Sequence, residues 1–268
     1  MKFNFRLFSL LLGRNPYHMT IEFHKSSSWY KSDYISFVNK MGDAKGLFPI
    51  SKNMPCLNDK SENAGSVNSH YFIQDLYVAQ KVFQNNPKKH VDVGSRIDGF
   101  VAHVASFREI ELIDVRKMES HIPNVIFKQA DLMDETKVPK EYCDSVSSLH
   151  ALEHFGLGRY GDPIDPDGHL KGFNNITKML KTGGVFYFSV PMGRQRIDFN
   201  AHRVFGMPYL LNMVSEDFDI ISFSYIDDKG ILHRDVPITD ERTANSFGCK
   251  FGCALFEMRK TINKSSKY

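Results

Sequence analysis

The sequence is poor in cysteine and lacks any long apolar run. Four cysteines in 268 residues are too few for a disulfide framework, so a reducing, cytoplasmic setting is expected. Cys249 and Cys253 flank a glycine beside a predicted last strand, where packing is favoured over metal or redox chemistry. No segment reaches the roughly 20 apolar residues of a membrane span, and the apolar stretch within residues 1–13 has no small-residue cleavage site behind it. Neither a membrane span nor a secretory leader is therefore expected.

A strong excess of one charge is also absent. The formal net charge is only +3, without the concentrated Lys/Arg stripe of a nucleic-acid footprint, so nucleic acid is not expected as a partner. Apolar residues make up 42% and charged residues 24% of the chain, which suits a protein with a sizeable core. The composition along the chain predicts an irregular extension with short helices at 1–68, one domain at 69–260 and a polar tail at 261–268.

What the sequence does contain is a series of short apolar strands that end on acidic residues. Three such strands are predicted, at 90–93, 111–114 and 125–131. They place Asp92, Asp114 and Asp131 at or near successive strand ends. An acid about 20 residues after the first glycine stands where a ribose-binding carboxylate belongs in a Rossmann-like unit. The third acid fits an adenosyl group, whose exocyclic amine needs an acceptor.

Helical periodicity surrounds these strands. Residues 70–83 show apolar residues at helical spacing, and the pattern predicts that Phe72, Leu76, Ala79 and Phe83 share the face that packs on the domain. Further helices are predicted at 100–107 and 208–214, a polar loop at 192–201, and two late strands at 218–225 and 253–259. The result is an α/β domain that closes with a strand pair.

Two later segments resemble a known superfamily. Asp144-Ser-Val-Ser-Ser-Leu-His-Ala-Leu-Glu-His154 is similar to the fourth-strand signature of class I S-adenosylmethionine (SAM) dependent methyltransferases, and Leu180-Lys-Thr-Gly-Gly-Val-Phe-Tyr-Phe-Ser-Val-Pro191 is similar to the fifth-strand signature. The resemblance implies a Rossmann-like, seven-stranded, mostly parallel sheet with helices on both faces and an antiparallel C-terminal strand pair. It also implies SAM as the cofactor, bound over the carboxyl ends of the first strands.

A narrower resemblance rests on three segments of the chain. Residues 69–76, 92–100 and 150–162 are similar to an uncharacterised methyltransferase-like family, some bacterial members of which accompany surface-polysaccharide genes. This resemblance implies a small-molecule acceptor, and the family's setting favours O-methylation of a sugar or sugar-phosphate in polysaccharide biosynthesis.

The predicted cofactor site departs from the superfamily pattern in its first loop. Only Gly94 stands in place, while Arg96 and Asp98 occupy the positions of the second and third glycines and Gly99 comes one residue late. Arg96 is interpreted either as the partner of the methionyl carboxylate or as a solvated residue beside Asp98, the N-cap of the next helix. The residues predicted to bind the cofactor are Asp92, Gly94, Ser95, Arg96, Asp114, Asp131, Leu132 and His150.

Catalysis and acceptor binding are predicted between residues 150 and 205. His154 is the first candidate for the general base, although Glu153 and His154 can equally buttress the next helix; Asp162 is the second candidate. A divalent cation held by the acids at 162–167 is an alternative, but Asp-Pro and Asp-Gly pairs favour turns, so no metal is predicted. Arg194, Arg196 and His202 are predicted to bind an anionic group of the substrate, or else to form a solvated loop.

Two other functions remain open at this point. The lost glycines are compatible with a non-catalytic relative that serves as a binding or scaffolding protein. An NAD-dependent oxidoreductase is disfavoured, because the first loop lacks Gly-x-Gly-x-x-Gly.

Overall fold

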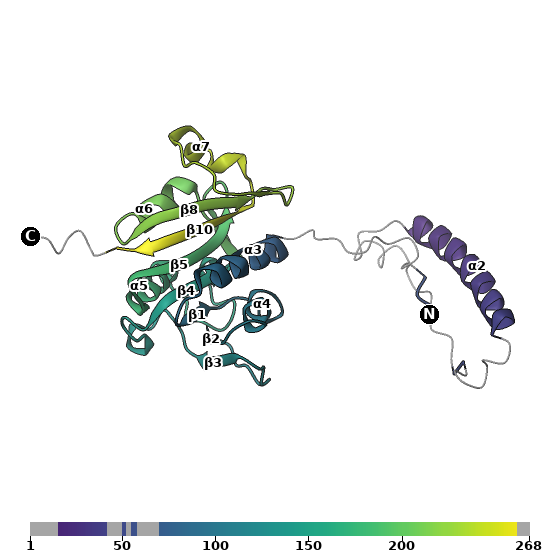
Figure 1. Ribbon diagram of the computed structural model, residues 1–268. Coiled ribbons are helices and arrows are strands. Elements are labelled where there is room, and N and C mark those ends of the chain that lie inside the picture. Colours follow the sequence, from purple (N-terminus) through teal and green to yellow (C-terminus); the bar gives the residue numbers. More distant parts are fainter. Residues whose placement is uncertain (1–15, 42–49, 52–54, 58–69, 262–268) are drawn as a thin grey trace, which may run out of the picture. The chain divides into compact units, whose positions relative to one another are not determined.

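A computed structural model of the chain describes residues 16–41, 50–51, 55–57 and 70–261 (Figure 1). The chain divides into two compact units, Met1–Ser66 and Val67–Tyr268, each of which is described by itself. The first unit contains α2 (Pro16–Lys40), a single helix of 25 residues in a segment for which only short helices were expected. The first thirteen residues and the tail from 262 onward lie outside the described residues. The predicted domain limits remain a prediction.

The second unit is built on one mixed sheet. Five parallel strands, β1 (His90–Val93), β2 (Ile110–Asp114), β3 (Val125–Gln129), β4 (Cys143–Leu149) and β5 (Leu180–Met192), stand in the order β3-β2-β1-β4-β5. The sheet continues antiparallel with β10 (Gly252–Lys260), β8 (Phe218–Ile226) and the two-residue β9 (Leu232–His233). This confirms the predicted Rossmann-like sheet and its antiparallel strand pair, with β9 as a short addition.

Helices cover both faces of this sheet (Figure 1). On one face α3 (His70–Asn85) and α4 (Ala102–Ala105) pack with Ile110 and Leu112 of β2. On the other face α5 (Gly168–Met179) and α6 (Met207–Val214) belong to the same core cluster as Val91 and Val93 of β1. Because successive side chains of a strand point to opposite faces, both faces bury apolar residues, as in sheets with helices on either side.

The packing of α3 corrects one prediction. Phe72, Leu76 and Phe83 keep 48%, 39% and 64% of their surface exposed, so they do not form the packed face. The buried face instead carries Val78 and Val82, together with Gln74, Asp75, Tyr77 and Ala79. The helix has two apolar stripes, and periodicity alone does not say which one meets the sheet. The smaller β-branched residues do so here, while Phe83 packs edge-on against Phe107 at the surface.

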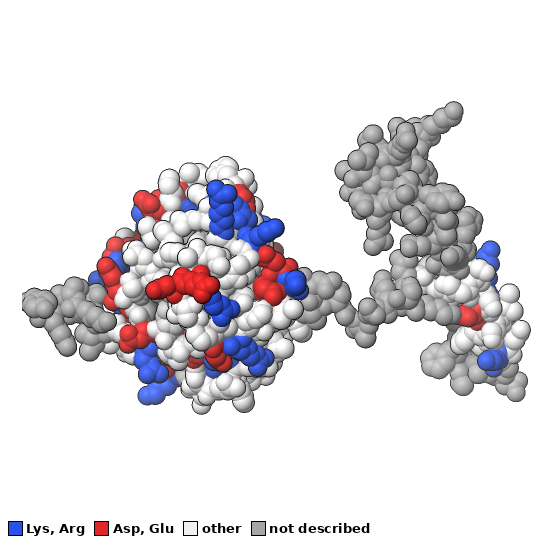
Figure 2. Space-filling model, turned by 90° about the horizontal axis from the view of Figure 1, so that it is seen from above, with Lys and Arg blue, Asp and Glu red and all other residues white. Residues whose placement is uncertain are grey.

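Two segments between the sheet strands are more regular than expected. The predicted polar loop at 192–201 contains β6 (Arg196–Asp198), which pairs with β7 (His202–Val204) in a hairpin. A short helix, α7 (Asp240–Ala244), lies between β9 and β10. Within the described part of the chain, none of the helices combines the length and apolar character that a bilayer span requires. The face shown in Figure 2 mixes charges of both signs without a single-sign stripe.

Candidate active site

The main cavity of the second unit lies at the carboxyl ends of β1, β2 and β4 and has a volume of about 360 Å³. Ligand crevices of open α/β sheets lie at this edge. Eight of the thirteen residues predicted to form the site line the cavity, which is more than the other described pockets contain. They are Gly94, Arg96, Asp114, Asp131, Leu132, His150, His154 and Asp162.

The loop after β1 passes beneath the cavity at Gly94. This residue has a φ of +72°, and a side chain there would approach Ala151 Cβ to 2.9 Å, so glycine is required. Asp92 is fully buried below the loop and accepts hydrogen bonds from Ser95 N at 2.9 Å, Ser95 Oγ at 2.7 Å and Ser147 Oγ at 2.5 Å. Neither Asp92 nor Ser95 lines the cavity, so their contact with the cofactor stays a prediction. They hold the loop in shape.

The missing glycines are accommodated by the backbone that follows. Residues Ile97–Val101 form a turn that is kinked at Gly99, whose φ of −131° and ψ of −110° are not helical, and a side chain at this position would clash with Asp75 Oδ2. Asp98 lies inside this turn rather than at its N-cap, which corrects that interpretation. Arg96 lines the cavity, but its Nε and Nη2 donate to the Asp98 carboxylate at 3.1 and 2.8 Å.

Asp114 stands at the end of β2, where a ribose-binding acid was predicted. Its carboxylate is paired with Arg116, whose Nε is 2.9 Å from Oδ1 and whose Nη2 is 2.6 Å from Oδ2. The backbone N–H of Arg116 also donates to Oδ1 at 2.8 Å. Each carboxylate oxygen can accept two hydrogen bonds, so Oδ2 keeps one acceptor position. Arg116 itself was not among the predicted site residues.

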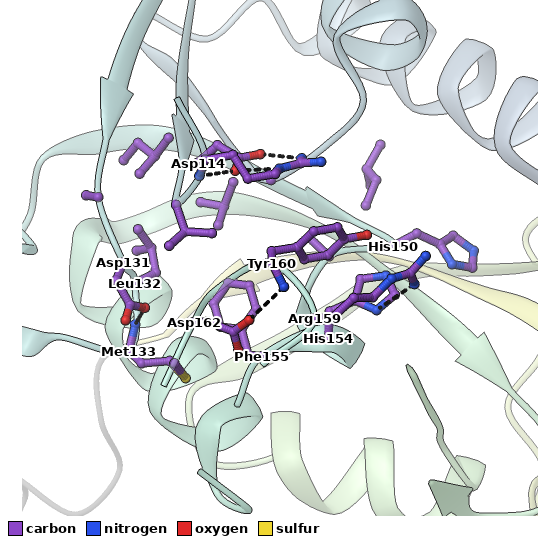
Figure 3. A pocket seen from close by; sticks show the side chains of 18 of the residues that line it. Asp114, Asp131, Leu132, Met133, His150, His154, Phe155, Arg159, Tyr160 and Asp162 are labelled. Atoms are coloured by element: carbon purple, nitrogen blue, oxygen red, sulfur yellow. Dashed lines mark hydrogen bonds and ion pairs between the residues drawn. The ribbon is translucent and has the colours of Figure 1, made fainter. Parts of the chain in front are cut away.

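Asp131 and Leu132 follow β3 at the far end of the cavity (Figure 3). Asp131 Oδ1 accepts a hydrogen bond from Met133 N at 2.8 Å, which fixes the carboxylate in a tight turn. The carbonyl of Leu132 accepts a hydrogen bond from the buried Asn175 Nδ2 at 2.8 Å. Helix α5 thereby holds the turn that carries Asp131 in place.

His150 stands at the end of β4 in the left-handed region, with a φ of +51°, which is uncommon for a residue other than glycine. Its Nδ1 lies 3.0 Å from Glu153 Oε1, and both side chains are almost fully buried. Burial acts to lower the pKa of His150, but the neighbouring Cys253 sulfur and the Glu153 carboxylate raise it well above its ordinary value. The protonated ring therefore pairs with the carboxylate, while its Nε2 has no hydrogen-bond partner among the described residues.

His154 has a fixed orientation. Its Nδ1 lies 2.7 Å from the carbonyl oxygen of Ala201, which can only accept, so Nδ1 carries the proton and Nε2 is the basic nitrogen. Burial lowers the pKa of His154 below its ordinary value, against the raising effect of Glu153. The Glu153 Oε1 atom is 3.7 Å from Nε2. His154 is therefore neutral at neutral pH, with a carboxylate nearby.

The loop after His154 lies over the cavity. Figure 3 shows Tyr160 between Asp114 and Asp131 on one side and His150 and His154 on the other. The Tyr160 ring contacts the guanidinium groups of Arg116 and Arg159, at 4.6 and 5.2 Å from the ring centre. Neither Tyr160 nor Arg159 was predicted as a site residue, although both stand within residues 150–162, one of the segments that carry the narrower resemblance.

Asp162 shapes this loop. Its carboxylate accepts hydrogen bonds from the backbone N–H groups of Gly156, Gly158 and Tyr160, at 2.8, 3.2 and 3.1 Å. Turn formation therefore accounts for Asp162, and its role as a proton acceptor stays a prediction without support from these contacts. Asp165 accepts a hydrogen bond from the backbone N–H of Asp167 at 2.9 Å and forms an ion pair with Lys171.

Of the three residues predicted to bind the substrate, Arg194, Arg196 and His202, the structure places one beside the cavity. His202 lines a second recess next to the cavity, with its Nε2 3.4 Å from Asp198 Oδ2. Arg196 is exposed and pairs with Asp198 at 3.1 Å, and neither it nor Arg194 lines the cavity or the recess. The nearby Arg203 is buried and donates to the backbone carbonyls of Glu153, Phe155 and Pro166, which makes it part of the scaffold.

Comparison with known proteins gives a family and a fold. A family model described as "Caenorhabditis protein of unknown function, DUF268" matches residues 100–243, more than half of the chain. No curated protein sequence matches the chain.

Among solved structures, the chain is similar to the 1,6-didemethyltoxoflavin-N1-methyltransferase of Burkholderia thailandensis, which was solved with bound 1,6-didemethyltoxoflavin and S-adenosylhomocysteine (SAH). The TM-score is 0.51 and the identity 13%, over 89% of this chain and 90% of that chain. The N-methyltransferase NodS of Bradyrhizobium japonicum WM9, in complex with SAH, is similar at 0.50 and 14%, over 79% and 94%. The 4+2 cyclase SpnF is similar at 0.51 and 14%, over 71% and 81%. These identities establish the fold alone.

Proposed function

This chain belongs to the DUF268 family and has the fold of class I methyltransferases, and we propose that it transfers a methyl group from SAM to a small-molecule acceptor. One observation carries the proposal: Asp114, Asp131, His150 and His154, which follow the three strands β2, β3 and β4, line a single cavity. Two proteins of similar fold were solved with SAH, the product that SAM leaves after methyl transfer.

The residues present fit the parts of SAM. Asp114 Oδ2 retains an acceptor position for a ribose hydroxyl, and Asp131 stands one strand further for the adenine amine. The protonated His150 lines the cavity, and its charge would attract the methionyl carboxylate. This assigns to His150 the role first considered for Arg96, whose guanidinium is paired with Asp98. The cavity volume of about 360 Å³ is within the usual range for small-ligand sites.

His154 is proposed as the general base. SAM, when bound, would supply a methyl group on a positively charged sulfur. The acceptor atom would attack the methyl carbon in line with the sulfur, which leaves as the neutral sulfide of SAH. The chain has to align that atom and take its proton, and His154 Nε2 is unprotonated and set at the mouth of the second recess. Glu153, 3.7 Å away, would stabilise the imidazolium that forms.

The acceptor is proposed to be a sugar or sugar-phosphate, methylated on oxygen during polysaccharide biosynthesis. This finer proposal follows from the resemblance of residues 69–76, 92–100 and 150–162 to a family found beside such genes. A second candidate is a non-catalytic binding or scaffolding protein. The similarity to a cyclase shows that this fold also serves other chemistry, so cofactor binding has to be measured.

Isothermal titration of the full chain with SAM, SAH and NAD tests the proposal. We expect SAM and SAH to bind and NAD not to bind. Asp114→Ala should weaken SAH binding at least about tenfold, because hydrogen bonds to a charged group contribute about 1.5–3 kcal/mol each.

Asp219→Ala is the matched control, since it removes an exposed carboxylate on β8 that does not line the cavity. It should leave SAH binding unchanged. Failure of SAM and SAH to bind the unmodified protein would favour the non-catalytic alternative.

A further inference from the structure

A second recess of about 260 Å³ adjoins the main cavity. The two share the wall formed by Tyr71, His150, His154 and Arg159. The recess extends away from this wall to His202 and Phe251. Its size is below that of most drug-sized ligand sites, so it suits one ring or one end of a longer molecule.

We propose that this recess binds the methyl acceptor, and that the acceptor carries an oxyanion, either phosphate or carboxylate, recognised by Arg159. The inference rests on the proposed methyltransferase function and names the chemical class of its substrate.

Arg159 differs from the other arginines of the cavity. Arg96 and Arg116 each pair with a carboxylate, Asp98 and Asp114 respectively. The guanidinium of Arg159 donates through Nη1 to the carbonyl of Ala201 at 2.9 Å and stacks on Tyr160. It has no carboxylate partner among the described residues, and no hydrogen bond from its Nε or Nη2 to any of them. A planar cation with donors left over is suited to bind an oxyanion in a bidentate manner.

The other charged groups of the recess do not compete for this role. The charge of His150 is balanced by Glu153, 3.0 Å away. Burial, helped by nearby His150, lowers the pKa of His70, which is therefore neutral at neutral pH. The His70, His150 and His202 rings do not form a metal site, since no group of three or more metal-ligating side chains is found in the described part of the chain. Arg159 remains as the fixed charge.

The far wall of the recess is aromatic. The Phe251 ring lies between His70 and His202, with ring centres 6.1 and 5.0 Å apart, and is 38% exposed. Such a platform packs well against the apolar face of a ring and places no charge beside it. An acceptor that lies on Phe251 with its oxyanion at Arg159 would have a hydroxyl within reach of His154 on the shared wall.

Isothermal titration of the full chain, saturated with SAH, tests this with four probes: inorganic phosphate, glucose 1-phosphate, glucuronate and glucose. We expect saturable binding of the anions and none, or far weaker binding, of glucose. Tighter binding of glucose 1-phosphate than of glucuronate would identify phosphate as the group, and the reverse would identify carboxylate. Arg159→Gln should weaken binding of the preferred anion at least about tenfold, since a bidentate charged contact is lost.

Arg259→Gln is the matched control, because Arg259 is an exposed arginine of β10 that lines neither cavity. It should bind the anions as the unmodified protein does. The inference is overturned if no anion binds the SAH-saturated protein, if Arg159→Gln binds anions normally, or if both variants lose binding equally. SAH binding is measured first for every variant. It shows that each variant is folded, and its absence in the unmodified protein would overturn the methyltransferase proposal instead.

Discussion

At the scale of single residues, His154 is the group on which the proposed chemistry depends. His154→Ala should lower kcat about 100-fold or more and leave SAH affinity nearly unchanged, because the ring takes a proton and does not hold the cofactor. Burial keeps the pKa of His154 below its ordinary value, so the ring should stay unprotonated at neutral pH. We therefore expect kcat to decline with falling pH only below about pH 6.5. Rates across pH 5 to 8 check this, with His103→Ala as a control outside the cavity. Full activity of His154→Ala would return the residue to a purely structural role.

Residue identities in the site could be predicted where a strand end fixes them. Asp114 and Asp131 follow short apolar strands, and the sheet brings them to one edge. Arg116 could not be predicted in the same way, because its importance depends on a side chain that folds back two residues onto Asp114. Asp162 was predicted as a proton acceptor, but its carboxylate accepts hydrogen bonds from three backbone N–H groups of its own loop.

At the scale of elements, a buried polar network joins β1 to β4. His90 Nδ1 and Nε2 contact Ser145 Oγ and Ser147 Oγ at 2.8 and 3.1 Å, and Ser147 donates in turn to Asp92. Burial raises the pKa of Asp92 to about 7, against the lowering effect of its serine partners. Because the folded state holds this proton more tightly than the unfolded state, the free energy of unfolding should fall as pH rises from about 4 to about 7.

Asp92→Asn removes this titration and keeps one acceptor oxygen, while its NH2 group would donate to the serine hydroxyls that now donate to Oδ2. Its stability relative to the unmodified protein should therefore rise between pH 5 and pH 8, by up to about 1.4 kcal/mol per pH unit over most of that interval. Urea unfolding at four pH values measures the difference. Asp219→Asn, an exposed carboxylate on β8, should show no such trend. Parallel curves for Asp92→Asn and the unmodified protein would mean that Asp92 stays ionised.

The elements themselves were largely predictable, and the exceptions have physical causes. The strand positions could be predicted because short apolar runs bounded by glycine and proline are typical of buried strands. The prediction of the packed face of α3 was wrong because the helix has two apolar stripes, and only its contact with the sheet determines which one is buried. The kink at Gly99 within Ile97–Val101 depends on the dihedral angles of a single glycine, which a propensity pattern does not predict.

At the scale of the whole molecule, the proposed cofactor and acceptor sites share one wall. Tyr71, His150, His154 and Arg159 line both, so the order of the sheet strands places a base, an imidazolium and a guanidinium without a carboxylate partner among the described residues between two cavities. The residues that build both cavities lie between 70 and 251, within the second unit. The two core clusters also lie wholly in this unit.

This arrangement predicts that residues 67–268 are sufficient for cofactor binding. A truncated chain that starts at Val67 should unfold cooperatively and bind SAH with the affinity of the full chain, since no residue of the cavity or its supporting core is removed. Thermal melting and isothermal titration of the two chains side by side measure this. A lower melting temperature together with lost SAH binding would show that residues 1–66 support the second unit. Unchanged SAH binding with loss of anion binding would instead assign the extension to the acceptor side of the reaction.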